Sequence, residues 1–156
     1  MYMQKLKLYE NKTLKLTNVL IKDILFDEID SYHIEVEKMK NYLKCQGIMP
    51  VGPLVQYTKS MVNVEGQIEI DVKILIQTSN YINNLELSYK MESIINVKNC
   101  MYVRYQGEES NLNFAYDKIK LAAFEENIPL KGDSYTVFID QNDDYILADI
   151  FMERAD

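Results

Sequence analysis

Hydrophobic and polar positions in the first half of the chain predict a strand, a helix and two further strands. Residues 13–26 alternate with the period of two that is typical of a β-strand. Apolar residues at helical spacing then predict one buried stripe, made of Tyr32, Val36, Met39 and Leu43. Gly47 is expected to end this helix, because glycine adopts positive φ without steric cost. Two alternating stretches, 54–62 and 67–77, predict a β-hairpin.

The second half of the chain repeats this order of elements. Strand signals cover 85–89 and 94–105, as one bent strand or two short ones. A second helix is predicted from a stripe formed by Leu112, Ala115 or Tyr116, Ile119 and Ala123. Asn127 is expected to end it, and strands are predicted at 135–139 and 145–152. Candidate N-caps precede both helices, namely Asp30 or Ser31 and Ser110 or Asn111.

The two halves of the sequence align with one another. Residues 48–52 match residues 128–132. One strand–helix–strand–strand unit leaves a sheet edge open, and two units placed edge to edge would cover it. We therefore predict a single α+β domain over 1–156, with repeats at about 13–78 and 85–154. The duplicated β-α-β-β units are expected to form a curved antiparallel sheet, with two helices on one face and a ligand cleft on the other.

The charge and the cysteines exclude several classes of protein. The formal net charge of -7 argues against direct nucleic-acid binding, because phosphate contacts need a positive surface. No apolar run approaches the ~20 residues of a membrane-spanning helix. The two cysteines, Cys45 and Cys100, form no CxxC pair. We therefore expect a cytoplasmic protein with free thiols and no membrane contact.

No motif for a metal or a cofactor is recognisable. His33 is the only histidine, which excludes a histidine-based catalytic triad and a zinc site with several histidines. The P-loop, GxGxxG and HExxH patterns are absent from the sequence. We therefore expect no cofactor.

Five segments resemble motifs of the gyrase-inhibitor-like (GyrI-like) small-molecule-binding domains. Residues 52–57 resemble the turn and strand written G-P-P-x-x-x-Y. Residues 101–107 resemble a strand that ends in (H)-x-G, and residues 114–119 resemble a helix written x-A-Y-x-x-L. Residues 132–140 resemble G-x-x-x-E-x-Y-x-D-P, and residues 148–152 resemble the closing T-E-(LIV)-x-(IV)-P. The resemblance extends over nearly the whole chain.

The resemblance implies a fold and a kind of site. Such domains serve as effector-binding modules of multidrug-responsive transcription regulators, and also occur alone as drug-sequestering proteins, as a gyrase-inhibitory protein and as hydrolases of reactive natural products. It implies a pocket between the repeats for flat, lipophilic, often cationic molecules, with aromatic walls and one or two buried carboxylates. This sequence departs from the pattern at Thr136 and Phe138, where the family has glutamate and tyrosine. Tyr105 replaces its basic residue, and Asp149 takes the other acidic position.

Candidate ligand-binding side chains combine carboxylates with aromatic rings. Asp149 lies in a predicted strand interior, a place that aspartate disfavours, and Glu69 is a second candidate. A carboxylate among rings attracts lipophilic cations through charge pairing and cation–π attraction. Strand alternation alone also explains Glu69 as a solvent-facing residue. The predicted ligand-binding residues are Asp149, Glu69, Thr136, Phe138, Tyr57, Tyr102, Tyr105, Tyr116, Tyr135 and Tyr145.

Three functions are compatible with these features. The first is non-catalytic binding of lipophilic or cationic small molecules, acting by sequestration, sensing, self-association or a partner regulator protein. The second is a hydrolase of reactive natural products that uses a pocket carboxylate, whose pKa would have to be raised for it to act as an acid. The third is an acidic inhibitor or interaction protein whose charge imitates nucleic acid.

Overall fold

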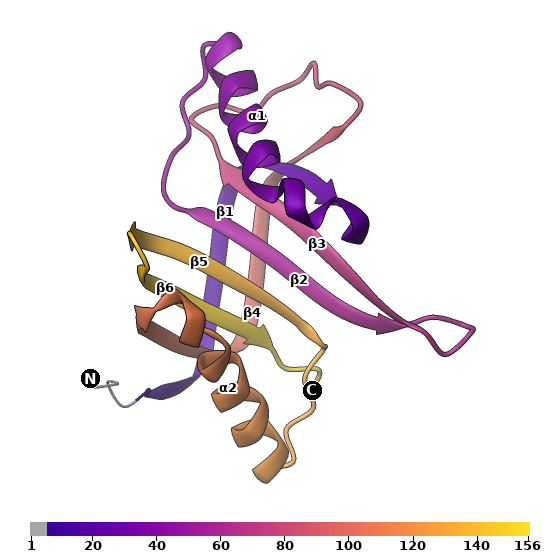
Figure 1. The fold of residues 1–156 in the computed structure, drawn as a ribbon, viewed down its shortest axis with the longest axis vertical. Coiled ribbons are helices and arrows are strands. Elements are labelled where there is room, and N and C mark those ends of the chain that lie inside the picture. The colour runs from indigo at the N-terminus through magenta and orange to yellow at the C-terminus, as the bar shows by residue number, and fades with distance from the viewer. Residues whose placement is uncertain (1–5) are drawn as a thin grey trace. The chain divides into compact units, whose positions relative to one another are not determined.

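The computed structural model describes residues 6–156, so the first five residues of the predicted domain lie outside the described part (Figure 1). This part of the chain has an α+β fold, as predicted. Its paired strands all run antiparallel. Its strands and α-helices are β1 (Leu8–Ile24), α1 (Tyr32–Cys45), β2 (Leu54–Val62), β3 (Ile68–Gln77), β4 (Tyr89–Glu108), α2 (Asn113–Glu125), β5 (Asp133–Asn142) and β6 (Tyr145–Glu153).

The chain divides into two compact units. The first unit is Lys15–Ile95, and the second unit combines Met1–Leu14 with Asn96–Asp156. β1 and β4 therefore contribute residues to both units. The predicted repeat bounds, 13–78 and 85–154, remain a prediction.

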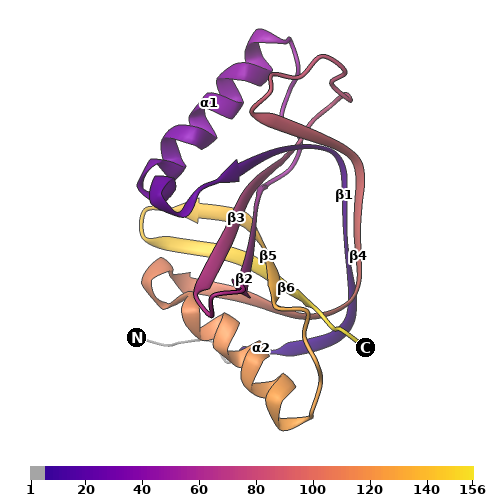
Figure 2. The same cartoon turned by 90° about the vertical axis from the view of Figure 1, so that its right-hand side faces the viewer.

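The first unit packs α1 on one face of three strands. The strands are hydrogen-bonded in the order β1–β3–β2, and α1 lies along them in Figure 2. The helix contributes the apolar stripe expected from the sequence, including Met39 and Leu43, both fully buried. They pack against Leu20 of β1 and Ile74 of β3. Burial of such side chains, at roughly 1.5–3 kcal/mol each, holds the helix to the strands.

The second unit packs α2 on one face of another set of strands. β6 lies between β5 and β4, antiparallel to both. Ala115, Ile119 and Ala123 form the buried stripe of α2, and they pack against residues such as Val103 and Ile150. Two alanines in this stripe allow close approach of the helix to the strands.

The turns after both helices use equivalent backbone hydrogen bonds. After α1, the amide of Ile48 donates to the carbonyl of Leu43 over 2.9 Å. After α2, the amide of Ile128 donates to the carbonyl of Ala123 over 2.8 Å. These bonds satisfy carbonyl groups that the ends of the helices would otherwise leave open. The predicted duplication is therefore visible in the backbone of each unit.

A pair of asparagines marks equivalent positions in β1 and β4. Asn18 has a φ of 48° and Asn99 a φ of 58°, in the left-handed region that asparagine tolerates. The Asn18 carbonyl accepts from the amide of Thr78 over 2.8 Å, and the Asn99 carbonyl accepts from the amide of Arg154 over 3.2 Å. These bonds establish the correspondence of β1 with β4 and of β3 with β6.

Each α-helix follows a short 3-10 helix. These are η1 (Phe26–Ser31) and η2 (Glu109–Asn111). Ser31 and Leu112 occupy the N-cap positions of α1 and α2, and neither start has a side-chain capping bond. Ser31 is at a predicted N-cap position, whereas the predicted cap of α2 and the side-chain bonds of both caps were wrong. 3-10 bonds, such as that from the Leu112 amide to the Glu109 carbonyl (3.1 Å), bind the preceding turn instead.

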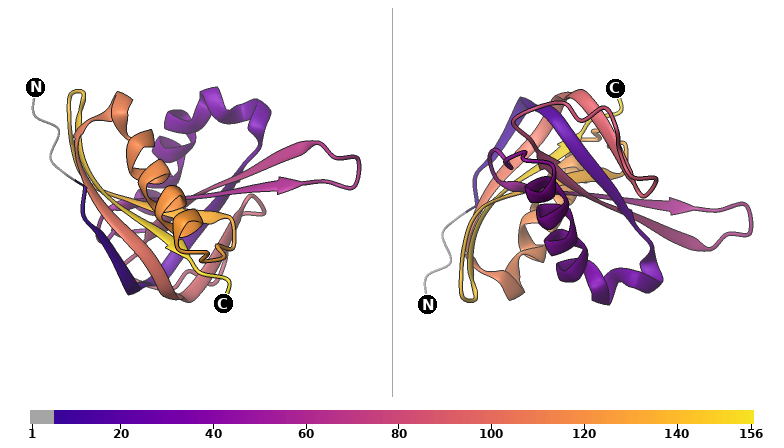
Figure 3. Two further views of the ribbon diagram at one scale, coloured as in Figure 1. Left: turned by 90° about the horizontal axis from the view of Figure 1, so that it is seen from below. Right: turned by 90° about the horizontal axis from the view of Figure 1, so that it is seen from above.

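Two strand boundaries also differ from the prediction. β1 begins at Leu8, before the predicted residue 13. The signals at 94–105 belong to the single long strand β4, which is the first of the two predicted alternatives, but this strand begins at Tyr89 and not at residue 85. Residues 85–88 precede β4 in a turn, where the Tyr89 amide donates to the Glu86 carbonyl over 3.1 Å. The β2–β3 hairpin extends past the beginning of α1 (Figure 3). Its turn exposes Val62, Val64 and Ile68.

Candidate ligand-binding site

The strands of the second unit have two chemically different faces. Val103 and Ile150 face α2 and belong to its core. Alternate residues of a strand point to opposite sides, so the side chains between them point away from α2. In the register of the strands, Phe151 of β6 lies between Tyr102 of β4 and Tyr135 of β5. Two residues further along β4, on the same face, Arg104 lies opposite Asp149. We call this surface the aromatic face, formed by Tyr102, Arg104, Tyr135, Asp149 and Phe151, with Tyr9 of β1 against Tyr102.

Asp149 is the centre of a hydrogen-bonded cluster on the aromatic face. The Tyr102 hydroxyl donates to Oδ1 of Asp149 over 2.6 Å. Arg104 donates from Nε to the same oxygen over 2.8 Å and from Nη2 to Oδ2 over 3.0 Å. The side chain of Asp149 is 12% exposed and that of Arg104 is 55% exposed. A largely buried carboxylate thus has a solvent-exposed arginine as its counter-charge.

Tyr102 and Arg104 keep their protons at neutral pH. Burial, followed by the hydrogen bond to Asp149, raises the pKa of the Tyr102 hydroxyl to about 12. The hydrogen bonds and the charge of Asp149 raise the pKa of the Arg104 guanidinium above its usual value. The cluster therefore combines a neutral phenol with a closed ion pair.

Aromatic rings lie directly beside this cluster. The ring centroids of Tyr102 and Phe151 are 4.9 Å apart with planes inclined at 43°. The ring of Tyr9 is 5.9 Å from that of Tyr102, inclined at 42°. These separations are typical of favourable aromatic contacts. The aromatic face therefore combines a large apolar surface with one charged pair.

Four predicted site residues belong to the core between the strands and α2. Tyr105, Thr136 and Phe138 lie on the face of the strands toward α2, and Tyr116 belongs to α2 itself. The hydroxyls of Tyr116 and Thr136 hydrogen-bond to each other. Tyr105 is buried, and its hydroxyl donates to the carbonyl of Glu108 over 2.5 Å. A Cβ at Gly107 would lie 2.8 Å from that hydroxyl, which explains the glycine. The structure does not bring these four residues together with Asp149.

Known structures share the fold of this chain. The EcmrR C-terminal domain has a TM-score of 0.66 at 16% identity, covering 96% of both chains. EcmrR in a complex with DNA has a TM-score of 0.70 at 15% identity. The match covers 96% of this chain, and this chain spans only 57% of that one. SAV2435 bound to tetraphenylphosphonium scores 0.53 at 9% identity, covering 97% of this chain and 94% of that one. A hydrolase from Listeria innocua has a TM-score of 0.59 at 9% identity, covering 98% of this chain and 93% of that one. No protein-family model and no curated protein matches the sequence.

These likenesses decide the fold. The chain has the GyrI-like fold. The fold implied by the sequence motifs is thereby confirmed. No helix of the described part is long and apolar enough to cross a lipid bilayer.

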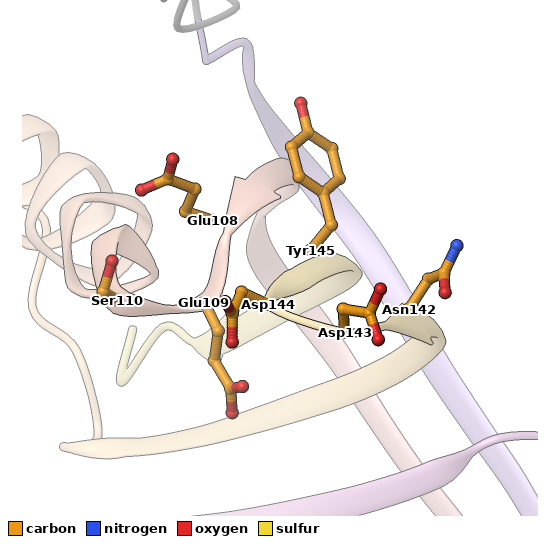
Figure 4. A pocket seen from close by; sticks show the side chains of 7 residues that line it. All are labelled: Glu108, Glu109, Ser110, Asn142, Asp143, Asp144 and Tyr145. Carbon is orange, nitrogen blue, oxygen red and sulfur yellow. The ribbon is translucent and has the colours of Figure 1, made fainter.

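Tyr145 lies apart from Asp149, in an open hollow of about 800 Å³ at one end of the second unit (Figure 4). The hollow is between the end of β4 and the β5–β6 turn, where the Glu109 amide donates to the Asp144 carbonyl over 2.7 Å. Its lining residues are Glu108, Glu109, Ser110, Asn142, Asp143, Asp144 and Tyr145. Among residues 6–156, no group of three or more acidic, histidine or cysteine side chains is arranged to hold a metal ion.

Tyr57 and Glu69 lie in the first unit, on the β2–β3 hairpin. Lys73 of β3 places its Nζ 5.5 Å from the centroid of the Tyr57 ring. Glu69 is exposed and accepts a hydrogen bond from Nδ2 of Asn63 over 3.1 Å. Glu69 is thus a solvent-exposed residue of β3 beside the hairpin turn, the orientation that strand alternation alone suggested.

Sequence reasoning missed three residues of the aromatic face: Tyr9, Arg104 and Phe151. Arg104 and Asp149 are direct cross-strand neighbours. Aligning β4 with β6 as strands of one ladder would have placed the arginine opposite the aspartate, since opposite charges are favoured in such pairs. Tyr9 lies in the part of β1 that the hydrophobic pattern did not predict as strand.

Proposed function

We propose that the chain is a non-catalytic binding module for lipophilic small molecules, cations among them, and that the aromatic face of the second unit is its contact surface. One observation carries the proposal: the Asp149 carboxylate lies directly beside the packed rings of Tyr102 and Phe151. Small-molecule sites combine a mostly apolar wall with a few placed polar groups in this way. Rings add attraction for a cation when its charge lies over their faces.

The fold supports the same proposal. EcmrR, whose C-terminal domain has this fold, was seen in complex with DNA, and SAV2435 was bound to tetraphenylphosphonium. By analogy, this module would act in sensing or sequestration, either alone or with a partner regulator. The cleft that the sequence motifs imply between the repeats stays a prediction.

Binding without catalysis is favoured over hydrolysis by the state of the polar groups. Both oxygens of Asp149 already accept hydrogen bonds, from Tyr102 and Arg104. A general acid or base needs a pKa near the working pH, whereas the pKa of Tyr102 is raised to about 12. The Tyr102 hydroxyl is therefore not prepared for proton transfer at neutral pH, and neither oxygen of Asp149 is free of a hydrogen bond.

Titration calorimetry with tetraphenylphosphonium tests the proposal. We expect saturable binding by the wild-type protein and a roughly tenfold weaker affinity for Phe151→Ala, because a ring of the contact surface is removed. Phe124→Ala is the matched control, since Phe124 is 82% exposed on α2 and lies outside the aromatic face. It should bind as the wild type does.

Mass spectrometry of the same mixture should recover the ligand unchanged. Equal affinities for wild type and Phe151→Ala would refute the aromatic face as the contact surface. Absence of binding to tetraphenylphosphonium and to neutral triphenylphosphine oxide would refute the small-molecule function itself.

A further inference from the structure

A protein cation already occupies the carboxylate of the proposed site. The guanidinium of Arg104 meets both oxygens of Asp149, at 2.8 and 3.0 Å. A forked pair of this kind is among the strongest that side chains form, and it cancels the charge of the aspartate. A lipophilic cation arriving at the aromatic face would therefore meet an ion pair with no net charge.

The first unit shows the same arrangement with the charges exchanged. Its cross-strand pair Asp23–Lys73 occupies the strand positions that Arg104–Asp149 occupies in the second unit, counted from Asn18 and Asn99 in one strand and from Thr78 and Arg154 in the other. The Lys73 ammonium is 3.8 Å from the Asp23 carboxylate, and it also lies 5.5 Å from the Tyr57 ring centroid. A side-chain cation thus lies beside a carboxylate and an aromatic ring at this place in both units.

We propose that Arg104 is an internal substitute for the positive group of a ligand, and that its displacement from Asp149 sets the charge selectivity of the site. This inference rests on the proposed binding function. When Arg104 is paired, the site distinguishes little between ligands of opposite charge. When a cation takes its place, Asp149 and Tyr102 become the ligand's polar partners.

The exposure of the two partners makes this exchange feasible. Asp149 is held in the strand by its burial and by Tyr102, whereas more than half of the Arg104 side chain is in solvent. Arginine has a long side chain with several rotatable bonds, so the guanidinium can leave while the backbone of β4 stays in place. The apparent affinity for a cation is then lowered by the fraction of time that Arg104 spends on Asp149.

A pair of probes of nearly equal shape tests the inference. Tetraphenylphosphonium and tetraphenylborate differ mainly in the sign of their charge. By calorimetry on the full chain, we expect wild-type affinities for the two probes to be within about threefold. In Arg104→Gln, the affinity for tetraphenylphosphonium should rise about tenfold and that for tetraphenylborate should fall. The double variant Arg104→Gln/Asp149→Asn should lose this gain in affinity for tetraphenylphosphonium.

Arg154→Gln is the charge-matched control. Arg154, the other arginine of the chain, makes a similar forked pair with Asp156 at 2.8 Å for each bond, outside the aromatic face. The variant Arg154→Gln should leave the affinities for tetraphenylphosphonium and tetraphenylborate unchanged. Circular dichroism spectra would show that each variant is folded.

The outcomes separate this inference from the function on which it rests. If tetraphenylphosphonium binds in a manner sensitive to Phe151→Ala but Arg104→Gln changes nothing, the role of Arg104 is refuted and the binding function stands. An equal gain for both probes in Arg104→Gln would also refute it, because arginine would then act as a steric block. If neither probe binds to any variant, both proposals fail.

Discussion

The two units have closely similar backbones and opposite electrostatics at one position. In the first unit the aspartate comes from β1 and the lysine from β3, whereas in the second the arginine comes from β4 and the aspartate from β6. The first pair is open, at 3.8 Å, with side chains 45% and 32% exposed. The second is closed, at 2.8 Å, with its aspartate largely buried. The two units therefore share the ladder and its left-handed asparagines, while the side chains on it differ.

Both units have a core in which a helix packs on strands, and substitutions there are expected to lower the unfolding free energy most. Met39 of α1 and Ile119 of α2 are both fully buried in their units. Truncation of either to alanine leaves a cavity and should cost about 2–5 kcal/mol of unfolding free energy. Urea denaturation of Met39→Ala and Ile119→Ala measures this. A loss below ~1 kcal/mol in one variant would show that its unit packs more loosely than the structure indicates.

The ion pairs differ between the two units, and substitution of the aspartate in each pair tests this difference. Asp149→Ala leaves the Tyr102 hydroxyl and the Arg104 guanidinium without their acceptor, and should cost about 2–3 kcal/mol. Asp23→Ala removes only exposed ion pairs and should cost less than ~1 kcal/mol. The same denaturation experiment compares them. Equal losses would contradict the contrast between a closed and an open pair.

An effect smaller than that of Asp149→Ala concerns the Tyr102 hydroxyl and depends on pH. Its pKa is raised to about 12 in the folded protein, against about 10 in the unfolded chain. The folded state therefore holds this proton more tightly, and the resulting stabilisation is complete below about pH 10 and is lost as pH rises toward 12.

Tyr102→Phe measures that contribution. At pH 8 it should be less stable than the wild type by about 1 kcal/mol, the value of one hydrogen bond. In urea denaturation, the difference should stay constant up to about pH 10 and shrink as the pH rises from there toward 12. Tyr81→Phe, at an exposed tyrosine of the first unit, is the control and should show no such trend. A difference that grows with pH would contradict the assigned direction.

Most of the fold was predictable because it depends on local patterns. The stripes of α1 and α2 and the turns at Gly47 and Asn127 follow from periodicity and from residues that tolerate positive φ. The helix starts were not predictable in this way, because the 3-10 turns before Tyr32 and Asn113 compete with side-chain caps. Single-sequence patterns carry no signal for that competition.

The candidate site was predictable only in part. Asp149 was singled out because aspartate is unfavourable in a strand, and Tyr102 because it falls in an element expected to flank the cleft. Arg104 could not be connected with them without the register of β4 on β6. Thr136 and Tyr116 were drawn into the prediction by motif position, although strand alternation turns Thr136 toward the helix. The sequence identified suitable residue types, but it did not show on which face of the sheet each side chain lies.

The sharing of β1 and β4 between the compact units has a consequence for any attempt to dissect the protein. A cut in the loop between the sequence repeats, near residue 80, would leave the amino-terminal fragment without residues 81–95 of its own unit. The carboxy-terminal fragment would lack the segment up to Leu14 that completes the other. Neither half of the sequence is thus an excisable piece. Fusion partners and affinity tags therefore belong at the chain ends, since a break between the sequence repeats separates segments of the same unit.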